Sequence, residues 1–149
     1  MLSIVQRVSR ASVTVEGKVV SEIGRGLLVL AGLEKGDTEN DLSYTARKTV
    51  ELRIFPDDDG KMNRSVPESG GTILAVSQFT LAADIRKGRR PSFDTAMPPE
   101  EAQSLFDRFV RELTALGVTV ATGSFGARME VSLVNDGPVT FIVDSRKRV

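Results

Sequence analysis

Two short segments of this chain place polar side chains where chemistry could occur. Residues 77–80 (Ser-Gln-Phe-Thr) follow the apolar run 72–76 and offer two hydroxyls, a carboxamide and an aromatic ring. Such a set at the end of a buried strand can bind the edge of a nucleobase or a carbonyl group. The residues alone equally allow an edge strand whose hydroxyls pair with backbone groups.

The second segment, residues 135–140 (Asn-Asp-Gly-Pro-Val-Thr), has the composition of a turn. Its Gly137-Pro138 bond can be cis, as about 5–6% of X-Pro bonds in folded proteins are. We expect residues 135–138 to connect two strands.

Positive charge is concentrated in two places, the run Arg86, Lys87, Arg89 and Arg90 and residues 146–148 near the end of the sequence. The whole chain is neutral, with 20 Lys and Arg against 20 Asp and Glu, so these are local patches. A basic run can bind phosphates, and that binding weakens with salt; a solvated loop is the alternative.

The chain of 149 residues contains no His and no Cys. Their absence excludes Ser-His-Asp triads, thiol nucleophiles and zinc sites built from His or Cys. Residues 57–63 look at first like a calcium loop, but they lack the alternating ligands and the glutamate at the twelfth position. We expect a solvated acidic turn there, with no metal and no cofactor in the protein.

Strands are predicted on both sides of these segments. Residues 2–33 alternate between apolar and polar side chains, which indicates three or four strands with a hairpin turn at Glu16-Gly17. Residues 26–32 are a continuous apolar run between glycines, the pattern of a central strand buried on both faces. Further strands are predicted at residues 118–120, 129–134 and 139–143.

Two helices are predicted. The first is capped by Asp37 and ends near Phe55-Pro56. The second opens at Pro98-Pro99 and is followed by Gly117. Its apolar positions recur at helical spacing and form a core stripe: Ala102, Leu105, Phe106, Phe109, Val110, Leu113 and Leu116.

These elements predict one α+β domain over residues 1–149, with a curved or barrel-like mixed sheet and two main helices. A composition of 40% hydrophobic and 27% charged residues is that of a globular protein. No apolar stretch reaches the ~20 residues of a membrane span, and the start of the sequence is not a signal peptide. We therefore expect a cytoplasmic protein without membrane contact.

Several segments together resemble the bacterial and eukaryotic D-aminoacyl-tRNA deacylases. The most specific pair is SQFTL at residues 77–81 followed by NDGPVT at residues 135–140. Further matching pieces lie in order along nearly the whole chain: QRV at 6–8, RIF at 53–55, GKMN at 60–63 and KGRRPSF at 87–93. Arg128 departs from the resemblance, because such proteins often carry another, sometimes acidic, residue there.

The resemblance implies a homodimeric enzyme that hydrolyses the ester between a D-amino acid and the terminal adenosine of tRNA. It also implies action on misattached glycine, and a role as a proofreader in translation. In this family the Gly-Pro bond is cis and enters the active site of the other subunit. Gly137 and Pro138 would then line the partner's pocket and exclude L-amino acids by steric clash.

The resemblance also implies roles for single residues. Ser77 and Gln78 would bind the terminal adenosine, and the backbone N–H of Phe79 would face the carbonyl oxygen. Thr80 is the only candidate side-chain nucleophile in this motif, yet no base is evident beside it, so the tRNA 2′-hydroxyl would assist catalysis instead.

Three further positions complete the expected site. Met129 would pack beneath the Gly-Pro wall or, as the alternative, serve only as a core residue. Arg86 and Lys87 would contact tRNA phosphates.

Two other classes of function fit the residues. The chain could be a non-catalytic module that holds the ends of RNA or DNA through the basic run and the Phe79 region. It could also be a dimeric structural or small-molecule-binding β-protein in which both motifs are plain turns and edges. The first predicts nucleic-acid binding without turnover, and the second predicts neither.

Overall fold

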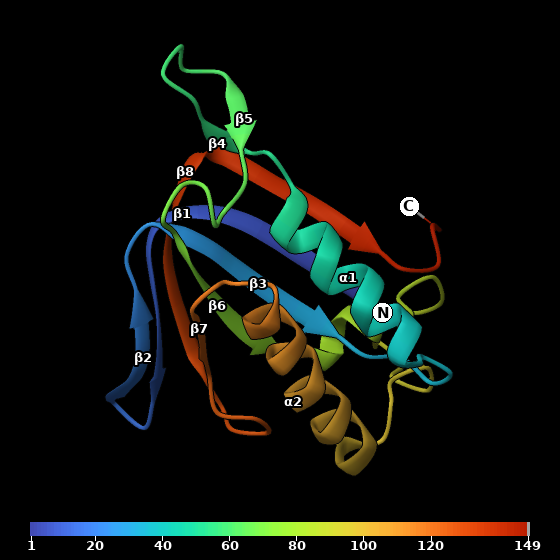
Figure 1. Cartoon of the computed structure of the whole chain (residues 1–149). Helices are drawn as coiled ribbons and strands as arrows, with labels where there is room; N and C mark the ends of the chain where they lie inside the picture. Colours follow the sequence, from blue (N-terminus) through green and yellow to red (C-terminus); the bar gives the residue numbers. More distant parts are fainter. Residues whose placement is uncertain (149) are drawn as a thin grey trace.

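The protein, described here over residues 1–148 of a computed structural model, is built on one curled, mixed sheet that nearly closes into a barrel. Figure 1 shows both long helices beside this sheet. The strands are β1 (Leu2–Val15), β2 (Lys18–Ile23), β3 (Gly26–Gly32), β4 (Phe55–Pro56), β5 (Met62–Arg64), β6 (Thr72–Ser77), β7 (Val120–Thr122) and β8 (Glu130–Asp144). The helices are α1 (Glu39–Glu51), the 3₁₀ turn η1 (Phe79–Ala82) and α2 (Pro99–Ala115).

Strand β1 organises the sheet, because it is long enough to pair with three neighbours. It runs antiparallel to β3 in its first half and to β2 in its second half, while β8 pairs with it along the opposite edge. Strands β3, β6 and β7 continue the sheet in parallel. The predicted α+β domain with a barrel-like mixed sheet is confirmed.

The central strand β3 is buried on both faces, as its apolar run predicts. Leu27 and Val29 belong to the cluster that packs against the helices. Leu28 faces the other way, into a second cluster with Val13 and Leu74. The strand therefore fixes β6, its parallel neighbour, between two apolar layers.

Helix α1 begins later than predicted and ends earlier. Thr38 is its N-cap and forms a capping box with Asp41, so the prediction of Asp37 as the cap is wrong. The Asp37 carboxylate is held instead by an ion pair with the α-ammonium group of Met1. The helix ends at Glu51, because the chain then extends into β4 at Phe55.

Helix α2 agrees with its prediction at both ends. It begins at Pro99 after the N-cap Pro98, and Gly117, with a φ of +91°, follows its end. Its buried side chains are Ala102, Phe106, Phe109 and Leu113. Leu116 is 38% exposed, so its assignment to the core stripe is wrong: it lies at the C-cap, where the chain leaves the helix.

The predicted turn at residues 135–138 is replaced by one continuous strand, β8. Asn135 explains this, because its side-chain oxygen accepts the N–H of Val139 at 2.7 Å and its amide donates to the Val139 carbonyl at 3.3 Å. The pairing with β1 shifts register here and then resumes. The Gly137-Pro138 peptide bond within this irregularity is cis.

The acidic segment 57–63 forms the tip of the β4–β5 hairpin, which projects from the body of the protein (Figure 1). The Asp57 carboxylate accepts hydrogen bonds from the backbone N–H groups of Asp59 at 2.9 Å and Lys61 at 3.0 Å. The negative charge of Asp57 is therefore stabilised by donors within the same turn. Within residues 1–148, no helix has the length and apolar character needed to cross a membrane.

Candidate functional site

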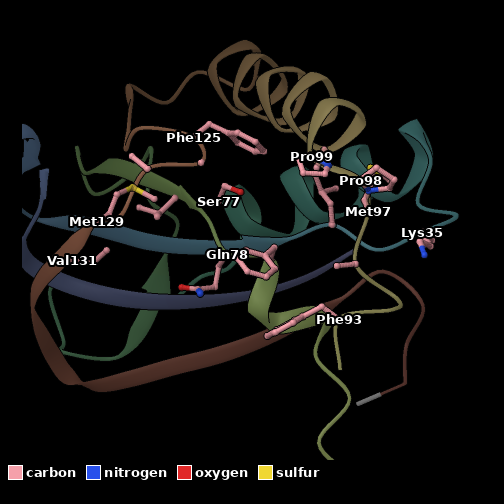
Figure 2. A pocket seen from close by; sticks show the side chains of 17 residues that line it. Lys35, Ser77, Gln78, Phe93, Met97, Pro98, Pro99, Phe125, Met129 and Val131 are labelled. Atoms are coloured by element: carbon pink, nitrogen blue, oxygen red, sulfur yellow. The ribbon is translucent and has the colours of Figure 1, made fainter. Parts of the chain in front are cut away.

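A cavity of about 720 Å³ opens at the C-terminal end of β6, beside the start of α2. Figure 2 shows side chains from both elements and from the segment before β8 pointing into it. Most of its wall is apolar, and the polar side chains come from Lys35, Ser77 and Gln78. A mostly apolar cavity of this size with a few polar groups is typical of a small-molecule site and has room for a nucleoside.

The sharp change of direction after β6 places residues 77–79 in the cavity wall. The backbone N–H of Gln78 still donates to Ala31 on β3, at 2.8 Å, and the 3₁₀ turn η1 then begins at Phe79. Within residues 1–148 the N–H groups of Phe79 and Thr80 have no protein acceptor, as expected for the first residues of a helical turn. These two donors are free to bind a carbonyl oxygen.

Thr80 does not line the cavity, although it follows the wall directly. Its hydroxyl oxygen accepts a hydrogen bond from the Gln78 side-chain amide. The arrangement favours a role for Thr80 in holding the Gln78 side chain.

Aromatic residues that the sequence motifs did not assign complete the wall. Phe93 packs on Phe79 with ring centroids 5.1 Å apart, and Phe125 packs on Phe106 of α2 at 6.1 Å. Met129 lines the cavity, and its sulfur accepts the N–H of Ser124 at 3.4 Å. Phe93 belongs to the motif KGRRPSF, which is the signal that could have assigned it, whereas nothing local distinguishes Phe125.

Gly137 and Pro138 lie outside the cavity of their own chain and are exposed on β8. Arg7 on β1 supports residues 136–138, because its Nε donates to the Asp136 carbonyl at 2.8 Å. Another nitrogen of the same guanidinium donates to the Ile54 carbonyl at 2.6 Å. The two residues are therefore presented outward on a supported segment.

The basic run forms an exposed loop closed by a bridge between Asp84 and Ser92. Arg86 pairs with Asp84 at 2.7 Å, and its hydrogen bonds hold the pKa of that carboxyl well below the usual value. Lys87, Arg89 and Arg90 make no ion pair with any residue from 1 to 148. None of this loop lines the cavity. Of the two residues predicted to contact phosphates, Arg86 is neutralised by Asp84, whereas Lys87 is a free cation within residues 1–148.

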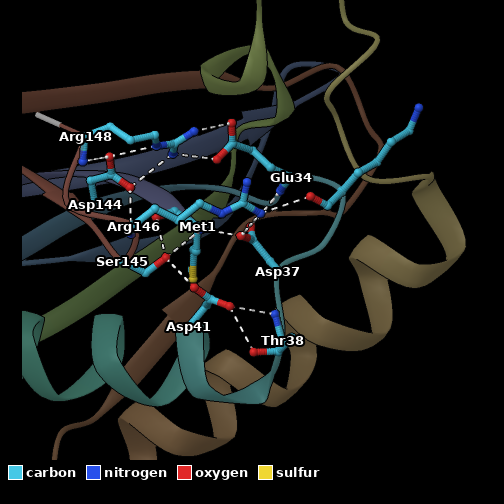
Figure 3. Close-up of polar contacts among 10 residues, drawn as sticks. Met1, Glu34, Asp37, Thr38, Asp41, Asp144, Ser145, Arg146 and Arg148 are labelled. Atoms are coloured by element: carbon cyan, nitrogen blue, oxygen red, sulfur yellow. Dashed lines mark hydrogen bonds and ion pairs between the residues drawn. The ribbon is translucent and has the colours of Figure 1, made fainter.

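An ionic cluster includes Glu34, which lies in the chain between the cavity-lining residues Leu33 and Lys35 (Figure 3). Arg148 bonds to the Glu34 carboxylate at 2.6 and 3.0 Å and to the Asp144 carboxylate at 3.0 Å. The hydrogen bond from Arg148 lowers the pKa of Glu34. Burial by itself would raise the pKa of Asp144, but hydrogen bonds from Arg148 and nearby backbone N–H groups lower it to about 2.

This cluster predicts a loss of stability in acid. Because the pKa of Asp144 is lowered by folding, its contribution is complete above pH ~4 and is lost as the pH falls toward about 2. We expect the free energy of unfolding to fall by about 2 kcal/mol more than in the variant Asp144→Asn across this range. Urea denaturation of both proteins at pH 5 and pH 2.5 measures the difference, and equal pH dependence would contradict the role of Asp144.

Comparison with known proteins identifies the family. The sequence matches the family described as D-Tyr-tRNA(Tyr) deacylase over residues 4–144. The chain belongs to this family. A relative named D-aminoacyl-tRNA deacylase from Geobacter sulfurreducens is 60% identical over 99% of this chain and 97% of its own length. Another of the same name, from Desulfitobacterium hafniense, is 59% identical over 99% of both chains.

Solved structures similar to this D-Tyr-tRNA(Tyr) deacylase family member carry two kinds of name. One, named c-Myc DNA Unwinding Element Binding Protein, is 44% identical, has a TM-score of 0.92 and is matched over 97% of this chain and 98% of that one. A probable eukaryotic D-amino acid tRNA deacylase is 20% identical with a TM-score of 0.78, over 95% and 97% of the two chains. This second likeness shows the shared fold.

Within the family fold, the predicted site residues do not all lie together. Ser77, Gln78, Phe79 and Met129 share one cavity, whereas Gly137 and Pro138 lie elsewhere on the surface. The sequence prediction missed Lys35, because it follows β3 and reaches the cavity only through the fold. Arg128 is exposed between two cavity-lining residues.

Proposed function

We propose that this protein hydrolyses the ester bond of D-aminoacyl-tRNA and releases the free D-amino acid and tRNA. The observation that carries the proposal is the free N–H of Phe79 in the wall of a cavity large enough for a nucleoside. Hydrolysis of an ester passes through a tetrahedral intermediate with a negatively charged oxygen. A fixed backbone donor at that position stabilises the charge without any side-chain base.

In the proposed mechanism, the protein contributes placement. Ser77 and Gln78 hold the terminal adenosine, and the ester carbonyl oxygen points at the N–H of Phe79. The 2′-hydroxyl next to the ester orients the attacking water, which explains how a chain without His or Cys can act as a hydrolase. Met129 and Phe125 exclude bulk water from the apolar side of the cavity.

Selectivity in this proposal depends on a homodimer. Pro138 is exposed on β8 and absent from its own cavity, so it is free to enter the cavity of a second subunit. There it would occupy the space that an L-side chain needs, while a D-side chain points away and glycine has nothing to clash. D-aminoacyl-tRNA and misattached glycyl-tRNA are thus accepted, and L-aminoacyl-tRNA is rejected.

The surface of β8 supports the proposed dimer. Four of its large apolar side chains are at least 37% exposed: Leu133, Val134, Phe141 and Ile142. They flank Pro138 along the strand, so an interface that covers them also carries Pro138 toward the partner. Exposed apolar groups concentrated on one strand are typical of a protein interface.

The function is tested by hydrolysis of matched D- and L-tyrosyl-tRNA by the purified protein, with and without a chelator. We expect rapid loss of the D-ester alone, with no effect of the chelator. Survival of both esters would overturn the proposed hydrolase.

A non-catalytic nucleic-acid-binding module is the second candidate function. It is favoured by the name of the 44% identical relative, a DNA unwinding element binding protein, and by the exposed cations of residues 87–90. It predicts that deacylated tRNA or single-stranded DNA binds while both tyrosyl esters survive. The same hydrolysis assay, accompanied by a binding measurement, separates the two functions.

Thr80→Ala should retain appreciable deacylation. The Thr80 hydroxyl accepts a hydrogen bond from the Gln78 side chain, and no base among the described residues 1–148 bonds to it. Its loss therefore frees the Gln78 side chain but removes no activated nucleophile. We expect kcat/KM to fall by less than about tenfold and Thr80→Ser to restore it. Single-turnover hydrolysis of D-tyrosyl-tRNA measures both; an inactive, well-folded Thr80→Ala that still binds tRNA would reassign Thr80 as a nucleophile.

The free cations of the basic loop should make tRNA binding depend on salt. Each phosphate contact that is lost reduces the slope of log K against log salt by about 0.7–0.9. We expect the double variant Lys87→Gln, Arg89→Gln to bind deacylated tRNA more weakly at low salt, with a slope smaller by about 1.5. Arg86→Gln is the matched control, because Arg86 is already paired with Asp84. Equal slopes in all proteins would show that the loop is only solvated.

A further inference from the structure

Lys35 is the one charged side chain in the cavity wall within residues 1–148. In the view of Figure 2, Lys35 and Met129 lie at opposite ends of the cavity, and Ser77 and Gln78 lie between them. The end at Met129 is apolar and is completed by Phe125. The cavity therefore carries a positive charge at one end only.

The main chain at Lys35 is fixed on both sides. Its N–H donates to the Thr95 carbonyl at 2.9 Å, and its carbonyl accepts a hydrogen bond from Arg146, also at 2.9 Å. The preceding residue, Glu34, pairs with Ala96 in an antiparallel bridge. These contacts use main-chain atoms of residue 35, so they hold the base of its side chain at the cavity and leave the ammonium group available to a ligand.

The acidic residues beside Lys35 already have other partners (Figure 3). The Glu34 carboxylate accepts hydrogen bonds from Arg148 at 2.6 and 3.0 Å. The Asp37 carboxylate accepts hydrogen bonds from Arg146 and from the backbone N–H of Glu34, each at 2.7 Å. The Lys35 ammonium group makes no ion pair with any residue from 1 to 148. An unpaired cation beside an apolar wall attracts an anion more strongly than the same cation does in open solvent.

We propose that Lys35 binds the phosphate that joins the terminal adenosine of the substrate to the preceding nucleotide. The inference rests on the proposed function, because that function assigns the adenosine to this cavity. In a nucleotide the ribose separates the base from the 5′-phosphate. This order matches a cavity with an apolar end, the polar side chains of Ser77 and Gln78, and a cation at the other end. The lysine ammonium group is a common ligand of phosphate in proteins.

The contact has a defined effect on the reaction. Every aminoacyl-tRNA carries this phosphate, whichever amino acid is attached and whichever its chirality. The phosphate is also remote from the bonds that change, so Lys35 binds the ground state and the transition state equally. Lys35 therefore contributes affinity for the tRNA end and takes no part in the choice between D- and L-esters.

The test compares two ligands that differ only in this phosphate, adenosine and adenosine 5′-(methyl phosphate). The methyl ester carries a single negative charge, as a phosphodiester in tRNA does. At low salt we expect the unmodified protein to bind the methyl phosphate about fivefold more tightly than adenosine. Lys35→Gln should bind the two ligands equally, and Lys35→Arg, which keeps the charge, should restore the preference. NMR titration at millimolar ligand concentrations measures all of these affinities.

The same variant should have a matching effect on the complete substrate. We expect Lys35→Gln to raise KM for D-tyrosyl-tRNA about fivefold and to change kcat by less than about twofold. The preference for the D-ester over the L-ester should stay unchanged. Lys18→Gln is the matched control, because Lys18 is exposed on β2 and does not line the cavity. The substitution at Lys35 leaves both main-chain hydrogen bonds of that residue in place, so we expect the variant to fold.

Three results would overturn the inference. In the first, Lys35→Gln still prefers the methyl phosphate. In the second, it loses affinity for adenosine as much as for the methyl phosphate, which would mean that Lys35 only shapes the wall. In the third, KM rises for D-aspartyl-tRNA but not for D-tyrosyl-tRNA, which would assign Lys35 to an acidic side chain of the amino acid. If the unmodified protein hydrolyses neither ester, the proposed function fails, and the preference for the methyl phosphate over adenosine still decides whether Lys35 binds phosphate.

Discussion

Gly137→Ala should reduce the preference for D- over L-tyrosyl-tRNA, expressed as the ratio of kcat/KM values, by about tenfold or more. A Cβ atom at Gly137 would lie 2.5 Å from Cγ2 of Val139 and 2.6 Å from the Val139 backbone nitrogen. The side-chain contact could relax by rotation, but the backbone contact cannot. The segment must therefore shift, and Pro138 moves away from the position proposed for it in the partner's cavity.

Pro138→Ala separates this displacement from the loss of the ring. It leaves the residue at 137 unchanged and removes the exposed ring that is proposed to exclude L-side chains. We expect the L-ester to be hydrolysed faster than by the unmodified protein, with an unchanged unfolding transition because Pro138 packs into neither core cluster. Unchanged selectivity in both folded, dimeric variants would remove the Gly-Pro segment from the explanation of chirality.

The parts of the fold that were predicted are those with local signals. An uninterrupted apolar run predicts the buried strand β3. A proline at the start and apolar residues at helical spacing predict α2. Strand β8 was predicted as two strands because residues 135–138 have turn composition. The Asn135 side chain and the long partner β1 hold them in one strand, and neither influence is visible in the local sequence.

The site divides in the same way. Residues 77–79 were predicted because their polarity follows a buried strand, and the fold places them in the cavity wall. Lys35 and Phe125 reach the same cavity from distant parts of the chain. The misplaced cap at Asp37 has the same origin, since its partner Met1 is remote in sequence and the local pattern equally suits a cap. Contacts of this range are set by packing of the whole domain.

Gly32 lies where the core strand β3 meets the cavity wall. A substitution at Gly32 therefore tests whether the position of the wall segment matters for the reaction. Gly32 is buried at the end of β3, directly beneath the segment that leaves β6. A Cβ atom at this position would lie 2.8 Å from Cβ of Leu81 and 3.0 Å from the backbone carbonyl oxygen of Gln78. Both atoms belong to the segment that carries the Phe79 N–H, so the added methyl pushes this donor outward.

Gly32→Ala should therefore lower kcat/KM for D-tyrosyl-tRNA by about ten- to a hundredfold, because a displacement of under 1 Å at a reacting group has effects of this size. Overpacking should also destabilise the domain by about 1–3 kcal/mol, so the assay belongs well below the unfolding temperature. Gly24→Ala is the matched control, because a Cβ at Gly24 has no atom of residues 1–148 within 4 Å, apart from its chain neighbours. If Gly32→Ala is folded and as active as Gly24→Ala, the placement of the Phe79 N–H does not limit the reaction, and the oxyanion must be stabilised elsewhere.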